Sequence, residues 1–494
     1  MISIYRHTMR HRIVVRGVIL VNVLVFAAIA ATVTMALVSW GGGVLKTTSM
    51  LGSREQAFQL AEAGVEYYRW HLAHASTDYQ DGTGHAGPYV HTVTDVDGDI
   101  IGSYSLTITP PPIGSTIVKV RSVGTASSTP PVSRTIQATL AIPSLAKYAV
   151  VANQNMRFGA GTEVFGPVHS NAGVRFDGVS HNIITSSLST YDDPDDSSSQ
   201  QRFAVYTTVS PQDPNPPAAV PNRPDVFMAG RQFPVQSYDF NGLTVDLSQM
   251  KADAQEAGVY IPASGSQGYH IVLKSNDTFD LYKVTSLQSP PSSCSNVNNQ
   301  SDWGTWSVRT QVHPVSGVNN SPQNYPFPTN GVIFVEDHVW VDGVVDGARL
   351  TIAAGKFPDN VSTRKDIMVN DDVIYTHYDG TDVISLVAQR NVSTGLFSQN
   401  DLRIDAALVA QNGRVGRYYY EVDCRSSGTN YYTRDVITLY GMIATNQRYG
   451  FAYTDGTGYD TRNIIYDSNL LYGPPPSFPL TSSQYQTISW QEVQ

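Results

Sequence analysis

The chain has 494 residues, of which 15% are charged, and its formal net charge is −10. This length exceeds what one ordinary hydrophobic core holds, so we expect two or three domains. The low charge and the abundance of glycine, serine, threonine, asparagine and tyrosine favour a β-rich extracellular protein over a cytoplasmic helical enzyme. An acidic chain without a basic cluster beyond its N-terminus also argues against nucleic acid as a partner.

The N-terminus combines basic residues with a long uncharged run. Four arginines and no acidic residue precede the glycine at position 17: Arg6, Arg10, Arg12 and Arg16. The run from Val18 to Trp40 can cross a bilayer, since about 20 apolar residues span the hydrocarbon core. The arginines place the N-terminus in the cytoplasm and the remaining chain outside it. Two alternatives are a cleaved secretory signal, whose apolar region is usually shorter, and a plain membrane anchor.

The start of this run and the segment after it resemble a known family. Arg16-Gly17-Val18 is similar to the class III leader of type IV pilins, whose dedicated peptidase cleaves after the glycine. The segment from Arg54 to Tyr68, with its Ala-Glu-Ala-Gly-Val-Glu sequence, resembles the helix of PilX-type minor pilins and of the largest minor pseudopilin of type II secretion. The resemblance covers only residues 10–75 of the chain.

This resemblance implies an assembly role for the N-terminal part of the chain. Residues 1–17 would be a leader cleaved between Gly17 and Val18, and residues 18–77 would form the pilin-like helix. The partners would be other pilin subunits and the pilus assembly machinery. The protein would lie in the inner or cytoplasmic membrane, with its N-terminus inside, and then in a filament at the cell surface.

Four positions of this helix carry specific expectations. Ala57, Ala61 and Gly64 recur at helical spacing, and small residues let helices approach closely, so we expect them to face neighbouring helices in a filament. Asn22 stands where most pilins have a glutamate that pairs with the methylated N-terminus of a neighbour. An amide cannot neutralise that charge, and by analogy the subunit would be a minor or tip component. The alternatives are that Asn22 is only a tolerated polar residue, or that the chain is not cleaved at Gly17 at all.

Residues 78–145 are expected to form a small antiparallel β unit. Alternating residues on either side of Asp95-Val-Asp-Gly-Asp99 predict two strands joined by a tight turn, and a second strand pair follows. Alternating aspartates also begin calcium loops. Here, however, the glycine is one place early and no glutamate occupies the twelfth position. We therefore expect a hairpin turn and no metal.

The larger body, residues 146–450, contains a weak repeat. Segments beginning at Val150, Leu386, Leu408 and Met442 share an apolar-apolar-Ala pattern. The second and third copies are 22 residues apart and the strands between copies are short, which favours a parallel β-solenoid over a two-sheet sandwich. The predicted fold class is therefore mainly β with one long N-terminal helix.

Three segments do not fit the repeat. We expect insertions near residues 186–223 and 240–320, the second with a helix from Leu247 to Glu256, and a Tyr/Gly/Pro-rich C-terminal segment at 451–494. The chain has two cysteines, Cys294 and Cys424, for which an exported body permits one disulfide. Two free thiols remain the alternative.

The sequence offers no convincing catalytic residue. Several aspartates could supply a carboxylate pair for glycoside chemistry, but most stand in turns where aspartate caps the backbone: Asp342, Asp346, Asp371, Asp372, Asp401 and Asp405. We expect no enzyme, metal or cofactor. Runs such as Tyr418-Tyr-Tyr420 can bind a glycan or protein ligand, although packing within the body explains them equally well. The alternative function is a membrane-anchored carbohydrate-binding or carbohydrate-cleaving protein.

Overall fold

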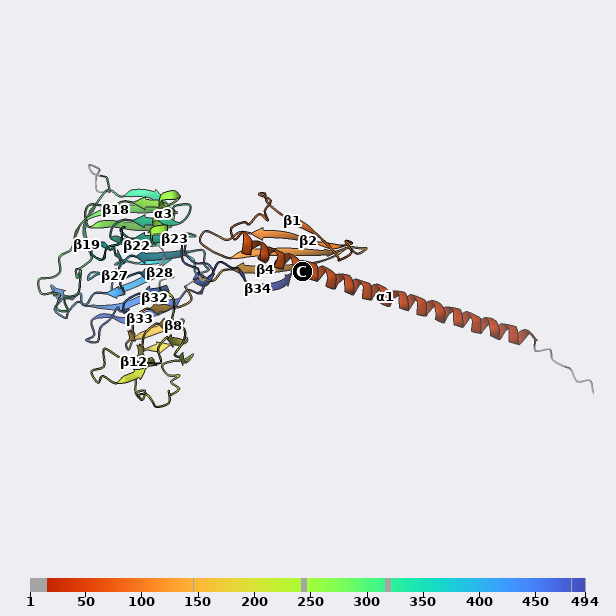
Figure 1. Cartoon of the computed structure of the whole chain (residues 1–494), viewed down its shortest axis with the longest axis horizontal. Helices are drawn as coiled ribbons and strands as arrows, with labels where there is room; N and C mark the ends of the chain where they lie inside the picture. The colour runs from red at the N-terminus through yellow and green to blue at the C-terminus, as the bar shows by residue number, and fades with distance from the viewer. Residues whose placement is uncertain (1–15, 145, 241–246, 316–320, 481, 494) are drawn as a thin grey trace, which may run out of the picture. The chain divides into compact units, whose positions relative to one another are not determined.

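The computed structural model describes residues 16–144, 146–240, 247–315, 321–480 and 482–493, and it divides into two compact units (Figure 1). Unit 1 holds the described residues up to Thr109, Lys119–Thr139 and those from Thr487 onward. Unit 2 holds Pro110–Val118 and Leu140–Gln486. The predicted class is confirmed: the protein is mainly β with one long N-terminal helix.

Unit 1 is a helix packed on an antiparallel sheet. Helix α1 runs without interruption from Arg16 to His74, so the glycines at positions 41–43, which would be expected to soften a helix, do not end it. The sheet has the order β1-β2-β3-β4-β34. Its strands are β1 Tyr89–Thr94, β2 Ile100–Thr109, β3 Val118–Ala126, β4 Val132–Ala141 and β34 Gln486–Val493.

One face of this sheet is covered by the second half of α1. Every second residue of β3 is buried, and so are Gly102, Tyr104 and Leu106 of β2, as the period of two in a strand requires when one face is covered. On the helix, the buried side chains recur three or four residues apart: Ala57, Leu60, Ala61, Val65, Tyr68 and Leu72. The predicted turn lies between β1 and β2, where the Asp95 carboxylate accepts hydrogen bonds from the amides of Asp97 and Asp99 at 3.0 and 2.9 Å.

Unit 2 is built from short parallel strands arranged in ladders (Figure 1). The first ladder joins β16-β21-β23-β26-β28-β32-β5-β8-β11-β15 in that spatial order. A second joins β22-β25-β28-β32-β33-β7-β10. A third has two parts, β17-β22-β24-β27-β29 and β6-β9-β14. The stacked coils of a β-solenoid require such parallel ladders. A regular β-solenoid nevertheless stays a prediction.

The strands of the ladders are short, and the apolar side chains of all three meet in one core. From the early part of the unit they are β5 Val150–Ala152, β6 Met156–Phe158, β7 Thr162–Phe165, β8 Val168–Ser170, β9 Val174–Phe176, β10 Val179–Ser180, β11 Ile184–Ser186, β14 Val205–Tyr206, β15 Arg231–Gln232, β16 Val259–Ile261 and β17 Gly268–Lys274. From the later part they are β21 Val332–Val335, β22 Val339–Val345, β23 Arg349–Ala354, β24 Ile367–Met368, β25 Val373–Tyr375, β26 Val383–Ala388, β27 Val392–Thr394, β28 Asp401–Ala410, β29 Val415–Arg417, β32 Thr433–Thr445 and β33 Gly458–Tyr466.

The four repeat copies lie side by side in the first ladder, in the order β26-β28-β32-β5. Leu386 pairs with Leu408, in the register that the repeat predicts. Leu408, however, pairs with Ile443 and not with Met442, so the fourth copy was aligned one residue too early. The correction matters because a slip of one residue exchanges the two faces of a strand. Ile443 is buried in the main core, whereas Met442 belongs to a second core cluster.

The order of the strands in space differs from their order in the chain. The first strand of the body, β5, pairs with β32, and β7 pairs with β33, so the beginning and the end of the ladder-forming chain are neighbours. The chain just before β5 also contacts the chain just after β33. The Ser144 amide donates to the carbonyl oxygen of Leu471 at 2.6 Å, and the Ser144 hydroxyl donates to that of Leu470 at 2.7 Å. Unit 2 therefore begins and ends in the middle of its stack.

The segments predicted as insertions contain structure of their own. Near 186–223 lies an antiparallel pair, β12 Thr190–Asp192 and β13 Gln201–Phe203. Within 240–320, helix α3 runs from Leu247 to Glu256, as predicted, and β18 Thr278–Leu287 pairs antiparallel with β17 and with β19 Val308–Val312. Strand β20 Gln323–Pro326 also pairs with β18. The C-terminal residues 451–494 do not stand apart: they supply β33 to unit 2 and β34 to the sheet of unit 1.

The remaining elements are short. They are the hairpin β30 Arg425–Ser426 with β31 Thr429–Asn430, and the one-turn helices η1 Val361–Thr363 and η2 Ser468–Leu471. Asn360 and Asp467 cap the two one-turn helices, each accepting a hydrogen bond from a backbone amide two residues later.

Candidate functional site

The first half of α1 is an apolar surface without a cover. Every large apolar side chain from Val18 to Leu51 is exposed by 46% or more, and the most apolar window has a mean hydropathy of 2.5 with none of its residues buried. By length and composition this helix can cross a membrane, as an N-terminal signal sequence also can. A helix that is apolar on all sides is stable in lipid or among other helices, and exposing it to water is costly.

The predicted cleavage point lies at the start of this helix. Arg16 is the first residue of α1 and the backbone of Gly17 is helical, so the Gly17–Val18 bond lies in the first turn. Val18 is 58% exposed. The other three leader arginines lie outside the described residues. Cleavage at Gly17 and a cytoplasmic N-terminus stay predictions.

Asn22 lies within the exposed apolar half of α1. It is exposed, and its neighbours Val21 and Val23 are exposed by 57% and 60%. A side-chain amide surrounded by lipid or apolar helices needs a hydrogen-bond partner, because leaving it unpaired there costs several kcal/mol, about 2–7 depending on the reference. Asn22 is therefore the side-chain amide on a surface whose other polar groups, between Val18 and Trp40, are the hydroxyls of Thr32, Thr34 and Ser39.

The small-residue stripe has a different role from the one predicted. Ala57 and Ala61 are fully buried, and they face the sheet of their own unit and not a neighbouring helix. A Cβ on Gly124 of β3 would lie 2.1 Å from the Ala57 carbonyl oxygen and 2.3 Å from the Ala61 amide nitrogen. A Cβ on Gly64 would lie 2.3 Å from the Ser122 hydroxyl. The small residues thus allow close approach of α1 to its own sheet.

The C-terminal end of α1 is tied to the loop that follows it. The Tyr68 hydroxyl donates to the Asp78 carbonyl oxygen at 3.1 Å, and His71 Nε2 lies 3.1 Å from the Asp78 carboxylate. Backbone amides of Gln80 and Gly82 also donate to that carboxylate, and they hold the pKa of Asp78 below its ordinary value. These contacts fix where the helix ends.

The two cysteines and the tyrosine-rich segment meet in unit 2. Cys294 is joined to Cys424 by a disulfide, and both belong to a buried cluster with Tyr418 and Tyr420. Tyr418 is 5% and Tyr420 1% exposed, so these side chains pack inside the body. Of the tyrosine run, only Tyr419 is partly exposed.

Three of the aspartates considered for catalysis, Asp342, Asp372 and Asp405, accept hydrogen bonds or contact a histidine. Asp405 is fully buried and accepts from the Tyr375 amide, the Tyr378 hydroxyl and Arg403 Nε at 3.0, 2.7 and 2.9 Å. Asp342 lies 2.6 Å from His270 Nε2, and Asp372 accepts from the Arg403 amide at 2.8 Å. These contacts join neighbouring ladder strands. The expectation that the protein is not an enzyme and needs no metal or cofactor stays a prediction.

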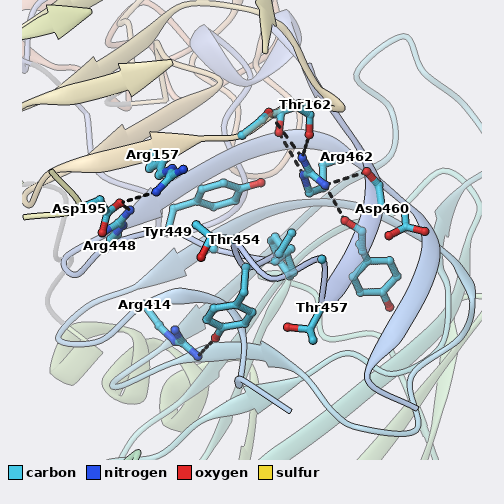
Figure 2. Close-up of a pocket in the computed structure, with 18 residues that line it drawn as sticks. Arg157, Thr162, Asp195, Arg414, Arg448, Tyr449, Thr454, Thr457, Asp460 and Arg462 are labelled. Atoms are coloured by element: carbon cyan, nitrogen blue, oxygen red, sulfur yellow. Dashed lines mark hydrogen bonds and ion pairs between the residues drawn. The ribbon is translucent and has the colours of Figure 1, made fainter. Parts of the chain in front are cut away.

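One cleft was not predicted, although the repeat carried a signal for it. Three of the repeat copies contain an arginine six or seven residues after their first residue, namely Arg157, Arg414 and Arg448, and all three line a cleft of about 590 Å3 in unit 2. Figure 2 shows these arginines around the cleft together with Arg462. Equivalent positions of adjacent repeats come together in a ladder, so the recurring arginine could have indicated a basic site.

Comparisons with known proteins do not assign the chain to a family. No protein-family model matches it, and no curated protein matches it. A solved structure, that of the competence-associated pilin ComZ from Thermus thermophilus, matches with 14% identity over 89% of this chain and 98% of that chain. The TM-score is 0.28, which is too low to support an argument about fold or function.

Proposed function

We propose that the protein is a pilin-like structural subunit whose helix α1 inserts among other pilin helices while its β body is displayed outside. The observation that carries this proposal is the division of α1. Its first half is apolar and exposed on all sides, and its second half is fixed to its own sheet. Soluble monomers rarely expose apolar patches of this extent.

The continuity of α1 favours insertion into a helical assembly. The helix has no break between its exposed and its packed half, so the sheet of unit 1 is joined to the apolar segment by a stiff rod. A flexible linker would serve a simple anchor equally well. The leader-like Arg16-Gly17-Val18 adds support, because it resembles the site at which pilins are processed before assembly.

We propose further that the protein is a minor or tip subunit. Asn22 offers an amide where most pilins offer a carboxylate, and an amide cannot balance the charge of a neighbour's N-terminus. At the tip of a filament no further subunit follows, so no neighbouring N-terminal charge has to be neutralised there. The large body of unit 2 also suits the end of a filament, where it would serve assembly initiation or adhesion.

The second candidate is a membrane-anchored extracellular carbohydrate-binding or carbohydrate-cleaving protein. It is favoured by the same apolar helix, which would then stay in the membrane, and by the polar cleft in unit 2. The two candidates differ in where the protein is found after filaments are removed from cells.

Shearing cells and sedimenting the filaments separates these candidates. We expect the full-length protein in the filament pellet, and we expect Val25→Lys to abolish its presence there because a charge in the apolar segment is costly. Val25→Leu is the matched control and should leave the protein in the pellet. Recovery of the unaltered protein only in the membrane fraction, from cells that make filaments, would contradict the proposal and favour the anchored alternative.

A further inference from the structure

The cleft of unit 2 lies where the first and last turns of the body meet. Strand β6 and the residues after it supply Arg157 and Thr162, and the segment around β33 supplies Arg448, Tyr449 and Arg462 (Figure 2). These two segments are about 300 residues apart in the chain and are adjacent through the pairing of β7 with β33. The volume, about 590 Å3, is within the range of small-ligand sites, roughly 300–1,000 Å3.

The lining of the cleft is basic, although the protein is acidic. Its charged residues are four arginines, Arg157, Arg414, Arg448 and Arg462, and two aspartates, Asp195 and Asp460. The cleft therefore carries an excess of two positive charges in a chain whose formal net charge is −10. A concave site of one sign concentrates ligands of the opposite sign.

One wall of the cleft already holds a carboxylate between two guanidinium groups. Arg448 Nη1 donates to Asp195 Oδ1 at 3.0 Å, and Arg157 Nη1 donates to Asp195 Oδ2 at 3.2 Å. Hydrogen bonds from Arg448 hold the pKa of Asp195 below its ordinary value, so it stays ionised. A guanidinium has five N–H donors, and within the described part of the chain Arg157 uses its side chain for this one hydrogen bond.

The opposite wall contains a buried cation without a carboxylate partner among the described residues. Arg462 is 7% exposed, and each of its side-chain nitrogens donates to neutral oxygens. Nε donates to Thr162 Oγ1 at 3.0 Å, Nη1 to the carbonyl oxygens of Tyr459 and Asp460 at 2.6 and 2.7 Å, and Nη2 to those of Gly159 and Ala160. Burial lowers the pKa of Arg462. A buried guanidinium whose hydrogen bonds all go to neutral oxygens is stabilised further when an anion approaches.

Between these walls lies an unpaired hydroxyl. Tyr449 is 5% exposed, and its hydroxyl is buried without a hydrogen-bond partner in the part of the chain that the structure describes. Figure 2 places its ring between Arg157 and Arg462. Burial raises the pKa of Tyr449, so the hydroxyl keeps its proton and can donate. Buried polar groups are nearly always paired in native proteins, so this hydroxyl points to a missing partner.

We propose that this cleft binds a saccharide that carries a carboxylate group, such as a uronic acid unit of an acidic polysaccharide. Arg157 and Arg462 attract the carboxylate, Tyr449 donates a hydrogen bond, and Thr454 offers a hydroxyl at the rim. Arginine suits a carboxylate because its planar fork matches the two oxygens. A nucleic acid fits less well, because the site's small excess of charge and its two aspartates oppose a densely charged polyanion.

This inference goes beyond the proposed function and does not depend on filament assembly. Calorimetric titration of the full-length protein in detergent micelles tests it, with trimers of galacturonate, mannuronate and glucuronate as probes and maltotriose as the neutral comparison. We expect at least one uronate trimer to bind at least about tenfold more tightly than maltotriose. Its affinity should fall as salt is added, because the attraction is electrostatic.

Two pairs of variants locate the binding in the cleft. We expect Arg157→Gln to weaken uronate binding about tenfold and Tyr449→Phe about threefold to tenfold. Their matched controls should bind like the unaltered protein: Arg364→Gln breaks an ion pair with Asp359 outside the cleft, and Tyr191→Phe removes another buried, unpaired hydroxyl outside the cleft lining. Tyr449→Phe removes no hydrogen bond among the residues that the structure describes, so it should not disturb the fold.

Four results would overturn the proposal. The first is the absence of binding by all three uronate trimers to folded protein, and the second is equal binding of maltotriose. The third is an equal effect of the cleft variants and their controls. The fourth is tighter binding of a single-stranded oligodeoxynucleotide or of inorganic phosphate than of any uronate trimer, which would assign the cleft to phosphate groups.

Discussion

Two glycines set the distance between helix and sheet in unit 1. Gly64 of α1 and Gly124 of β3 leave no room for a Cβ, and the atoms that a Cβ at Gly124 would meet belong to the backbone of α1. Backbone cannot move aside as a flexible side chain can. At the residue scale, the distance between α1 and the sheet of unit 1 therefore depends on the absence of a Cβ at Gly64 and at Gly124.

This close approach gives the first prediction. Gly124→Ala should destabilise unit 1 by about 1–3 kcal/mol, because the added methyl forces the sheet away from the helix. Hydrogen exchange measured by mass spectrometry should then show faster exchange in β2 and β3. The matched control is Gly42→Ala, where nothing lies within 4 Å of the added Cβ. Slower or unchanged exchange in Gly124→Ala would contradict the structure of this contact.

A buried carboxylate gives the second prediction. Asp337 is 4% exposed and accepts from the Ser264 hydroxyl, the Ser264 amide and Lys365 Nζ at 2.6, 2.9 and 2.9 Å. Burial alone would raise its pKa, but these partners outweigh burial and the pKa of Asp337 is lowered. A lowered folded-state pKa contributes stability above the unfolded value, about 3.9, and that contribution is lost as the pH falls through the folded value.

Asp337→Asn should therefore lower the stability of unit 2 at pH 7, and the difference from the unaltered protein should shrink as the pH falls below about 4. Denaturant unfolding at several pH values measures this. Asp423→Asn, at a side chain that is 58% exposed, should show little effect at any of these pH values. A difference that is the same at pH 3 and pH 7 would show that the charge of Asp337 does not stabilise the fold.

At the scale of the element, α1 is one continuous helix whose two halves have different environments. Its apolar first half has no cover within the described chain, while its second half presents a regular row of buried residues to the sheet. The sequence predicted this helix closely, and it predicted α3 to the residue, because helical periodicity is a local property. The sequence could not show whether the small residues of α1 pack against a neighbouring helix or against their own sheet. Small side chains allow close approach in both cases.

The repeat illustrates the same limit for strands. The apolar-apolar-Ala pattern identifies strands of the first ladder, and the copies that begin at Val150, Leu386 and Leu408 have the register that the repeat predicts. The fourth copy was misplaced by one residue because both Met442 and Ile443 are apolar and both are buried. A strand that is buried on both faces gives no alternation from which its register can be chosen.

The disulfide gives a prediction at this scale. Cys294 and Cys424 are 130 residues apart in the chain, so their bond removes much conformational freedom from the unfolded state. Replacing both by serine should lower the free energy of unfolding of unit 2 by about 2–5 kcal/mol. Denaturant unfolding measures the change, and the unaltered protein after reduction should behave like the double variant. An unchanged midpoint would contradict a structural role for the disulfide.

At the scale of the whole molecule, two features come from contacts between distant parts of the chain. The early strands β5 and β7 pair with the late strands β32 and β33, and the last strand, β34, completes the sheet of unit 1. The first was not predictable, because similar repeat copies specify that strands stack but not which copies are neighbours. The second joins strands that are too far apart in the chain for a local pattern to indicate the pairing. The arginine-lined cleft depends on the first of these contacts, so the recurring arginines can indicate a basic site but not the full set of residues that line it.

The central claim is that the protein enters a filament through a processed N-terminal helix. The most direct test is mass spectrometry of the N-terminal peptide of the protein recovered from sheared filaments. The account predicts a peptide that begins at Val18, as cleavage after Gly17 requires. A filament-associated protein whose N-terminal peptide begins at Met1 would contradict it.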